Sequence, residues 1–372
     1  MVFLLLAVLA LVALYLSRIE VRDIFSPELR RLVLLAFTHL REKRFAEAVQ
    51  AYNVLLELKP DYPEGYVNRG NAYFALGEVE KAIADYSKAI DLRPNFAEAY
   101  NNQGNAYLSQ GRIEEALRDL SKACELNPHL AEAFFNRAMA FSEAGKPEEA
   151  LEDLSKCLLL NPSDSEALYR RALLVLRYKG FDTTVPQDIS KALVLKPTDP
   201  RLYMLRGTYF FQRGEHEKAL EDFSKVITLQ RSNVQAHYLK GLVLLELGRC
   251  EEAIGSQSDA IAIDPTFFRA YFARGLCLYR KGDYERALED FSAVLLLRPD
   301  FFRGYLFRAL TYKALGRYEE AEKDLRYLEE QGFPWKNSLR EDGVEGEYLG
   351  EDVGVFEFLG SEAPVVAHGG TT

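Results

Sequence analysis

A proline returns every 34 residues through much of this 372-residue sequence, and this fixed interval constrains the fold more than any other feature. Four prolines follow one another at the interval, the next comes after 35 residues, and two more resume it: Pro60, Pro94, Pro128, Pro162, Pro197, Pro265 and Pro299. Arg231 stands where the period requires a further proline. Self-similarity of this kind is typical of repeat proteins, in which each unit buries its apolar face against its neighbours.

The period divides the sequence into nine units, of which the fifth is one residue longer than its neighbours. Small residues recur at the eighth and twentieth positions, where we expect two helices to approach closely, because larger side chains would push them apart. The units are 29–62, 63–96, 97–130, 131–164, 165–199, 200–233, 234–267, 268–301 and 302 to about 335. The small residues are Gly70, Gly104, Gly207, Gly241, Gly275, Ala36, Ala138, Ala172 and Ala309 at the eighth position, and Ala48, Ala82, Ala116, Ala150, Ala219, Ala253, Ala287 and Ala321 at the twentieth.

Glycine between these two positions predicts the point where the chain reverses. It takes the left-handed conformation that ends a helix without a Cβ clash. The proline that closes each unit is expected to stop the second helix, and large apolar residues fill that helix's buried face. The glycines are Gly77, Gly111, Gly145, Gly214, Gly248, Gly282 and Gly316; the large residues include Tyr52, Tyr86, Leu120, Leu154, Phe223, Phe291 and Leu325.

The second unit shows the whole pattern in GYVNRGNAYFALGEVEKAIADYSKAIDLRPN, which contains Gly70, Tyr73, Gly77, Ala82, Tyr86, Ala89 and Pro94. In these residues the sequence closely resembles the tetratricopeptide repeat family, over about 29–335. The resemblance implies an all-α protein, a right-handed α-solenoid (superhelix) of antiparallel helix-turn-helix repeats with a concave groove that holds peptides or partner helices. It does not identify the partner.

Residues 1–17 differ from everything that follows. Val2 to Ser17 is uncharged, and at ~1.5 Å per residue it spans roughly 24 Å, somewhat short of a ~30 Å hydrocarbon core. Because Arg18 and Arg22 follow, we predict a membrane anchor with the repeat array in the cytoplasm, joined by a tether at 18–28. The alternative is a cleaved signal and a periplasmic or secreted protein, although the basic start of a signal is missing. Ser26, Pro27 and Glu28 form a good start for the first helix.

The fifth unit, 165–199, is irregular. Val185 replaces the expected alanine, and Pro186 falls where the second helix should already be running. We interpret Thr184 as a late N-cap of a shortened helix, which predicts a weak junction because short helices bury little apolar area. The unit is either a hinge between units one to four and six to nine or the product of sequence drift, which we favour.

The periodicity ends after Trp335. Residues 336–372 contain seven glycines and eight acidic residues against two basic ones, a composition that predicts disorder. One hypothesis for this acidic tail is that part of 345–358 folds back into units seven to nine as a removable plug.

Oppositely charged residues recur at the seventh and twenty-third positions, which predicts an ion pair within each unit. The pairing is imperfect, since Lys240 faces Ser256 and Gln103 goes with Asp119. The basic residues are Arg69, Arg137, Arg171, Arg206, Lys240, Arg274 and Arg308, and the acidic ones are Asp85, Asp119, Asp153, Asp222, Asp290 and Asp324.

The family resemblance also implies which residues line the concave groove, and their chemistry changes along the chain. In the N-terminal half they are acidic or amides, including Glu64, Glu98, Asn71, Asn101 and Asn105. In the C-terminal half they are basic or aromatic: Arg201, Phe211, Tyr238, Arg269, Phe272, Tyr279, Arg280, Arg303 and Lys313. Arginine forks carboxylates and rings bury apolar side chains, so the second set suits an extended acidic segment of a protein.

No residues suggest catalysis, a cofactor or a metal site. The five histidines are dispersed, the four cysteines form no CxxC pair, and Gly145-Lys146 lacks the rest of a phosphate-binding loop. The net charge of −10 opposes a nucleic-acid partner. Some related co-chaperones clamp the terminal peptide of heat-shock chaperones, but the nearest run here, Asn101, Asn105, Asn136, Glu166 and Arg170, lacks both lysines of that clamp.

These observations favour a non-enzymatic protein-protein interaction scaffold or client receptor tethered to a membrane, which binds an extended or helical partner segment in its groove. Two alternatives remain. One is a secreted or periplasmic envelope-assembly protein with a cleaved signal, and the other is the regulatory subunit of an enzyme complex.

Overall fold

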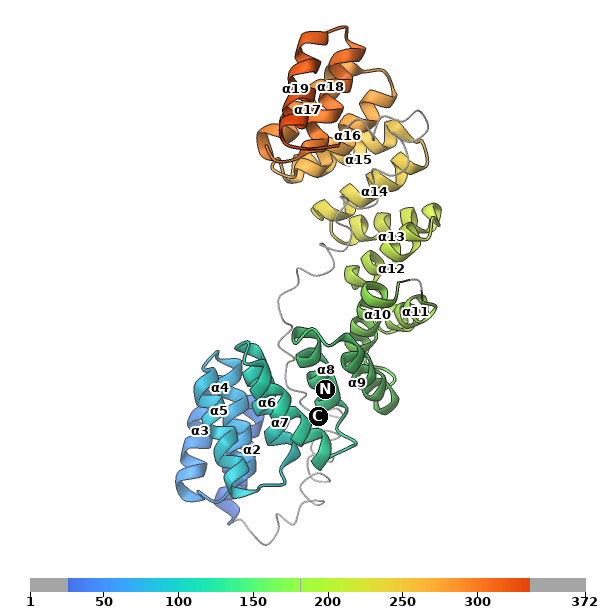
Figure 1. The fold of residues 1–372 in the computed structure, drawn as a ribbon. Coiled ribbons are helices and arrows are strands. Elements are labelled where there is room, and N and C mark those ends of the chain that lie inside the picture. The colour runs from blue at the N-terminus through green and yellow to red at the C-terminus, as the bar shows by residue number, and fades with distance from the viewer. Residues whose placement is uncertain (1–25, 181, 335–372) are drawn as a thin grey trace. The chain divides into compact units, whose positions relative to one another are not determined.

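The computed structural model describes residues 26–180 and 182–334, which form eighteen α-helices and no strand (Figure 1). The helices pair in sequence order as nine hairpins. The first helices are α2 Pro27–Arg41, α4 Pro63–Ala75, α6 Ala97–Ser109, α8 Ala131–Glu143, α10 Ser165–Lys179, α12 Pro200–Gln212, α14 Val234–Glu246, α16 Phe268–Arg280 and α18 Phe302–Ala314. The second helices are α3 Phe45–Leu58, α5 Val79–Leu92, α7 Ile113–Leu126, α9 Pro147–Leu160, α11 Thr184–Leu195, α13 His216–Leu229, α15 Cys250–Ile263, α17 Tyr284–Leu297 and α19 Tyr318–Glu330. The fold is therefore the all-helical solenoid that the repeats predict.

The predicted localisation, a single-pass membrane protein, is wrong. Among the helices of 26–180 and 182–334, none is long and apolar enough to cross a bilayer, which overturns the prediction of a single-pass membrane protein with a cytoplasmic array. The stretch 1–17, on which the anchor was placed, lies outside the described residues, as does most of the tether at 18–28. The acidic tail and the plug at 345–358 also lie outside them.

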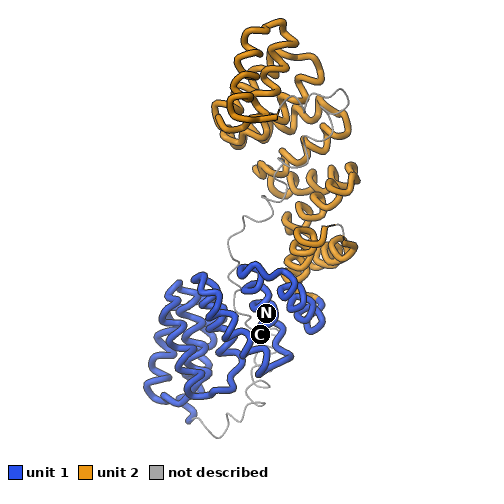
Figure 2. The backbone as a smooth tube through the Cα atoms, viewed as in Figure 1, with its two compact units in different colours: residues 1–162, 364–372 blue, residues 163–363 orange. Residues whose placement is uncertain are grey.

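The chain divides into two compact units between Pro162 and Ser163 (Figure 2). Among the described residues, the first unit holds α2–α9 and the second holds α10–α19. The irregular fifth repeat therefore belongs entirely to the second unit.

Each hairpin reverses at a residue in the left-handed backbone region. The seven glycines that the sequence singles out have φ between 70° and 79°. In the first repeat the same position is Lys43, with φ 58°, although its Cβ makes this conformation costly. The reversal is thus fixed by the architecture even where glycine is missing.

Close packing of the two helices confirms the role of the small residues. A Cβ placed on Gly70 would lie 2.6 Å from the Tyr86 ring, and one on Gly275 would lie 2.8 Å from Phe291. Both rings are almost fully buried, so neither can move aside without opening a void. The eighth position therefore admits the ring of the second helix only because its own side chain is minimal.

The second helices end two residues before the closing prolines, for example at Leu58 before Pro60 and at Leu297 before Pro299. Helix α13 ends at Leu229, the same point of the repeat, although Arg231 stands in place of proline. Proline is compatible with this end but is not required to produce it.

The fifth repeat contains the shortened helix that its sequence predicts, since α11 has 12 residues and the other second helices have 13 or 14. Thr184 is its first residue rather than its N-cap. The carboxylate of Asp182 accepts hydrogen bonds from the Thr184 amide at 2.7 Å and from its hydroxyl at 2.6 Å. Val185, in place of alanine, is completely buried.

Adding one methyl group to a helical glycine should have opposite effects at two sites. Gly275→Ala should lower the free energy of unfolding by roughly 1–3 kcal/mol, because the methyl group overpacks against Phe291. Gly255→Ala should raise it by about 0.5–1 kcal/mol, because nothing lies within 4 Å of the new Cβ in α15. Urea unfolding of both variants measures the difference, and equal shifts would contradict the close-approach argument.

Replacing the one non-glycine reversal should stabilise the first hairpin. Lys43→Gly should raise the free energy of unfolding by about 1 kcal/mol, since glycine adopts positive φ without the Cβ clash. Lys43→Ala is the matched control, because it removes the same charge but keeps the Cβ. Thermal melts in which the two variants shift equally would show that charge, rather than backbone conformation, is responsible.

Candidate functional site

Six repeats hold an arginine and an aspartate in a two-point ion pair between their helices, here called the ion-pair ladder. In each pair, the arginine Nε and one Nη donate to the two carboxylate oxygens over 2.6–2.9 Å. The pairs are Arg69–Asp85, Arg137–Asp153, Arg171–Asp188, Arg206–Asp222, Arg274–Asp290 and Arg308–Asp324. The prediction of ion pairs within the repeats is confirmed. Asp188 was not among the predicted residues, because the extra residue of the fifth repeat places it one position later than the aspartates of the other repeats.

Aromatic rings complete the setting of the ladder arginines. The guanidinium of Arg69 lies 5.5 Å from the ring centroid of Tyr66 and 5.9 Å from that of Tyr73. Hydrogen bonding to Asp85 raises the pKa of Arg69. A planar cation is thus held by a buried carboxylate on one side and by ring faces along its own helix.

Some ladder arginines also join consecutive repeats. The Nη1 atom of Arg69 donates to Asn53 Oδ1 of the preceding repeat at 2.8 Å. In the same way, Arg274 Nη1 donates to Ser258 Oγ at 3.0 Å. One guanidinium therefore links the two helices of its own hairpin to the hairpin before it.

The third repeat departs from the ladder in a way that the sequence did not predict. Gln103 does not bond Asp119; its amide donates to Ser87 Oγ at 2.6 Å and to the Ile83 carbonyl at 3.3 Å, both in the preceding repeat. The nearest cation to Asp119 is Arg118, with Nε 3.7 Å from Oδ1. Gln103 therefore makes hydrogen bonds to the preceding repeat, as some ladder arginines do, but it makes none to the aspartate of its own repeat.

Two of the predicted amides of the first unit, Asn71 and Asn101, belong to one hydrogen-bonded chain. Asn136 donates to Asn101 at 2.9 Å, Asn101 donates to Asn102 at 3.1 Å, and Asn102 donates to Asn71 at 2.9 Å. Asn101 is 1% exposed, and Asn105 is buried in the same helix. The side chains of Asn71 and Asn101 are thus engaged with other asparagines of the first unit.

Arg201, the first predicted cation of the second unit, is saturated by carboxylates. Its Nη2 lies 2.9 Å from Glu166 Oε2 and 2.8 Å from Asp199 Oδ2, and its guanidinium lies 4.9 Å from the Tyr169 ring centroid. Hydrogen bonds to Asp199 and then Glu166 raise the pKa of Arg201. Glu166, at the second position of the fifth repeat, therefore neutralises Arg201, the first of the predicted basic residues.

The predicted aromatic residues divide between core and surface. Tyr238 is 3% exposed and packs edge-on against Phe267, while Phe272 is 8% exposed and packs edge-on against Phe301 and Phe307. Both belong to the core rather than to an open face. Phe211 and Tyr279 are half-buried, in contact with His216 and Tyr284 respectively.

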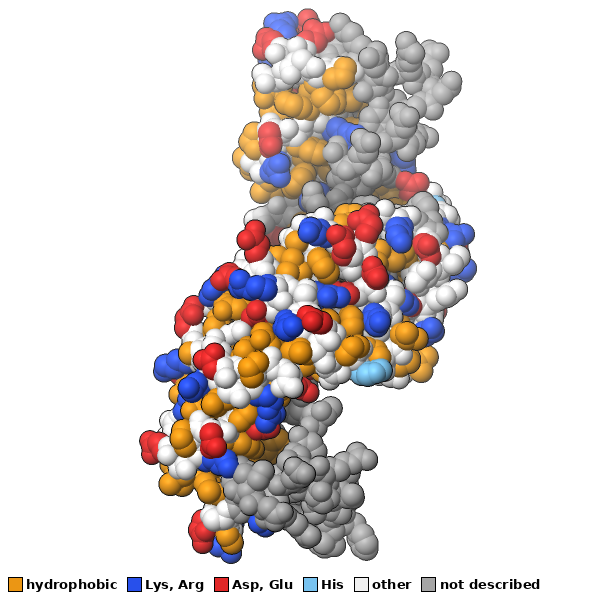
Figure 3. All heavy atoms as spheres, turned by 60° about the horizontal axis from the view of Figure 1, so that its bottom comes forward, with side chains coloured by type: hydrophobic (Ala, Val, Ile, Leu, Met, Phe, Trp, Pro, Cys, Tyr) orange, Lys and Arg blue, Asp and Glu red, His pale blue; other side chains and the backbone are white. Residues whose placement is uncertain are grey.

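Four predicted cations remain on α16 and α18. Arg269 and Arg303 are half-buried near the helix starts, and Arg280 and Lys313 are exposed in the last turns. Arg280 Nη1 lies 3.4 Å from the Leu245 carbonyl oxygen. Within 26–180 and 182–334, no ion pair joins Arg280 or Lys313 to a carboxylate. On the face seen in Figure 3, basic and acidic side chains are interspersed.

The described residues offer little reactive chemistry. They contain no cluster of His, Cys, Asp or Glu that could hold a metal ion. Burial raises the pKa of Cys124 to about 11 and that of Cys277 to about 12, so both thiols stay protonated at neutral pH.

Sequence comparisons match the repeats to three family models. One, described as TPR repeat, matches 40–77, 70–111 and 207–248. Two others, each described as tetratricopeptide repeat, match 97–130, 131–164 and 268–301, and 234–267 and 302–326. No curated protein matches the chain.

Several solved structures are similar in fold at low identity. A tetratricopeptide repeat protein from Parabacteroides merdae is 21% identical, with 67% of this chain and 98% of that one covered and a TM-score of 0.48. A chain of the APC/C hetero-tetramer Cut9-Hcn1 is 18% identical, with 80% and 58% covered and a TM-score of 0.48. YrrB, described as a TPR protein with an unusual peptide-binding site, is 22% identical, with 61% and 99% covered and a TM-score of 0.36.

A double-mutant cycle measures the strength of one ladder pair. Arg274→Ala and Asp290→Ala should each destabilise the chain, and their coupling energy should be about 1–2 kcal/mol, because both side chains are largely buried and joined by two charge-assisted bonds. Urea unfolding of the two single variants and the double variant gives this value. Additive effects would show that the pair does not contribute as a unit.

Proposed function

Because the chain belongs to the tetratricopeptide repeat family, whose repeats generally act as protein-interaction scaffolds, we propose that its second unit binds an acidic segment of a partner protein. The function that we propose for the chain is that of a non-enzymatic scaffold. The binding surface is the face of α16 and α18 that carries Arg269, Arg280, Arg303 and Lys313, here called the basic face.

The charge composition of these two helices carries the proposal. Helices α16 and α18 contain six basic residues and no aspartate or glutamate. Arg274 and Arg308 are taken by the ion-pair ladder, whereas the other four cations have no carboxylate on their own helices. A high density of cations on helices that contain no acidic residue of their own favours an anionic ligand, and guanidinium groups bind carboxylates in two-point geometry.

The packing of the repeats supports this face as the binding surface. Several pairs of consecutive first helices, including α14 with α16 and α16 with α18, contact each other, whereas consecutive second helices do so less. First helices therefore lie toward the inner side of the curve within each unit, where a long segment can contact several repeats at once.

Half-buried rings add an apolar component to the same surface. Tyr279 precedes Arg280 in the last turn of α16 and packs edge-on against Tyr284 at 5.4 Å between centroids. Such a ring has one face committed to the protein and can offer the rest to a ligand side chain. We therefore favour a segment in which acidic residues alternate with aromatic ones.

The test removes the two exposed cations. In the Arg280→Ala/Lys313→Ala variant, affinity for a fluorescein-labelled peptide of alternating glutamate and tyrosine should fall about tenfold or more, since two charge-assisted contacts are lost. Fluorescence anisotropy measures the dissociation constant. Raising the salt from about 50 to about 300 mM should weaken binding to the unaltered chain and affect the variant less.

Lys191→Ala/Lys225→Ala is the matched control, because it removes two exposed positive charges from the second helices α11 and α13. Its affinity for the peptide should stay close to that of the unaltered chain. Equal weakening in the two variants, or equal binding of a lysine-tyrosine peptide, would reject the basic face as the binding surface.

A further inference from the structure

The third repeat keeps the aspartate and the aromatic rings that surround an arginine in the neighbouring repeats, but it has no arginine there. In the second and fourth repeats, the seventh residue is an arginine whose cation lies between two rings of its own helix and the aspartate of the second helix. In the third repeat the corresponding aspartate is Asp119 and the corresponding rings are Tyr100 and Tyr107, but the seventh residue is Gln103. The carboxylate and the rings are retained, and the arginine is missing.

Asp119 is buried, and within the described residues its one ion pair is with Arg118. The residue is 7% exposed, and burial raises the pKa of its carboxyl group, while Arg118 opposes that shift. Arg118 Nε lies 3.7 Å from Oδ1, outside hydrogen-bond distance, and the Arg118 side chain is 70% exposed. A solvated arginine at that distance replaces little of the two-point bonding that the other ladder aspartates receive.

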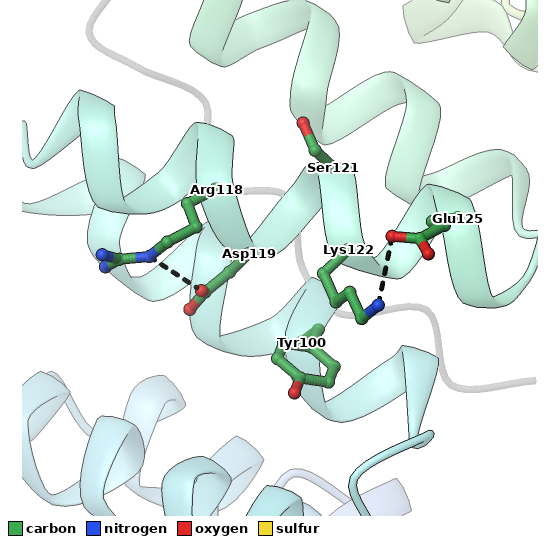
Figure 4. Close-up of a pocket in the computed structure, with 6 residues that line it drawn as sticks. All are labelled: Tyr100, Arg118, Asp119, Ser121, Lys122 and Glu125. Atoms are coloured by element: carbon green, nitrogen blue, oxygen red, sulfur yellow. Dashed lines mark hydrogen bonds and ion pairs between the residues drawn. The ribbon is translucent and has the colours of Figure 1, made fainter.

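An open hollow of about 450 Å³ lies beside this carboxylate, between α6 and α7 (Figure 4). It is bordered by Tyr100, Arg118, Asp119, Ser121, Lys122 and Glu125. Lys122 is turned to Glu125, with Nζ 3.1 Å from Oε2. Tyr107 is covered by the guanidinium of Arg112 at 4.3 Å, so Tyr100 is the ring left for an incoming group.

We propose that this hollow is a binding site for a guanidinium group, supplied by an arginine side chain of a partner protein. The arriving group takes the place that Arg69 and Arg137 fill in the adjacent repeats, with its two N–H groups on Asp119 and its plane against Tyr100. An open hollow admits a side chain that projects from another polypeptide. The site lies in the first unit and does not depend on the basic face of the second.

The geometry favours guanidinium over ammonium. In all six ladder pairs, two nitrogens of one planar group meet the two oxygens of one carboxylate, which a lysine ammonium cannot reproduce. The seventh repeat has the half-buried Lys240 at the seventh position, and its twenty-third position is Ser256 rather than aspartate. Within the described repeats, aspartate at the twenty-third position thus occurs with arginine, except in the third.

The test uses the peptide acetyl-Gly-Gly-Arg-Gly-Gly-amide and a counterpart with citrulline, which has the same shape without the charge. In NMR titrations of the full chain, the arginine peptide should shift the Asp119 carboxyl carbon saturably, and the citrulline peptide should bind at least tenfold more weakly. Asp119→Asn should weaken arginine-peptide binding at least tenfold. Equal binding of the two peptides would overturn the proposal.

Gln103→Arg provides a variant in which the chain fills its own site. The new arginine should pair with Asp119, raise the thermal midpoint by a few degrees, and abolish binding of the arginine peptide. Arg280→Ala/Lys313→Ala should leave this binding unchanged, which separates the site from the basic face. Retained binding in Gln103→Arg, or tighter binding of free L-arginine than of the peptide, would refute a docking site for a partner's arginine.

Discussion

The structure depends on the close approach of the two helices of each hairpin, which a small residue at one position of the first helix allows. At the eighth position of the repeat, glycine or alanine lets a large buried residue of the second helix fill the interface, as Tyr86 does over Gly70. That contact fixes the distance and rotation of the two helices. With both fixed, the seventh position of the first helix lies near the twenty-third of the second, or the twenty-fourth in the longer fifth repeat, and a charged pair can recur along the array.

Because the repeats are so regular, a repeat that differs from the others indicates a candidate functional site. An aspartate that is neutralised by arginine in six repeats is an ordinary structural group there, but the same residue at 119, beside Gln103, is a buried carboxylate next to a hollow. The basic face arises by the reverse change, since α16 and α18 keep their arginines and carry no acidic residue. In both places the repeat fixes where the side chains lie. The proposed functions follow from a residue type that is missing: arginine in the third repeat, and acidic residues in α16 and α18.

Sequence periodicity predicted most of the fold, because each signal was local to one hairpin. The reversing glycines, the small packing residues and the ion-pair ladder all follow from positions within a unit. Contacts between repeats were harder to foresee: Arg201 pairs with Glu166 of the preceding repeat, and Phe272 packs in the core against Phe307 of the following one. Asp188 was missed because one inserted residue shifts its register. The membrane localisation rested on residues that take no part in the repeats.

Helix α13 reaches the same end as its counterparts with Arg231 where they are followed by proline. Since the native geometry survives the exchange, the closing prolines act chiefly by narrowing the conformations open to the unfolded chain. Such a residue can be lost from one copy at a modest thermodynamic cost and no architectural one. A tandem array can therefore accumulate sequence divergence at its loops, repeat by repeat, while the surfaces built on its helices remain in register.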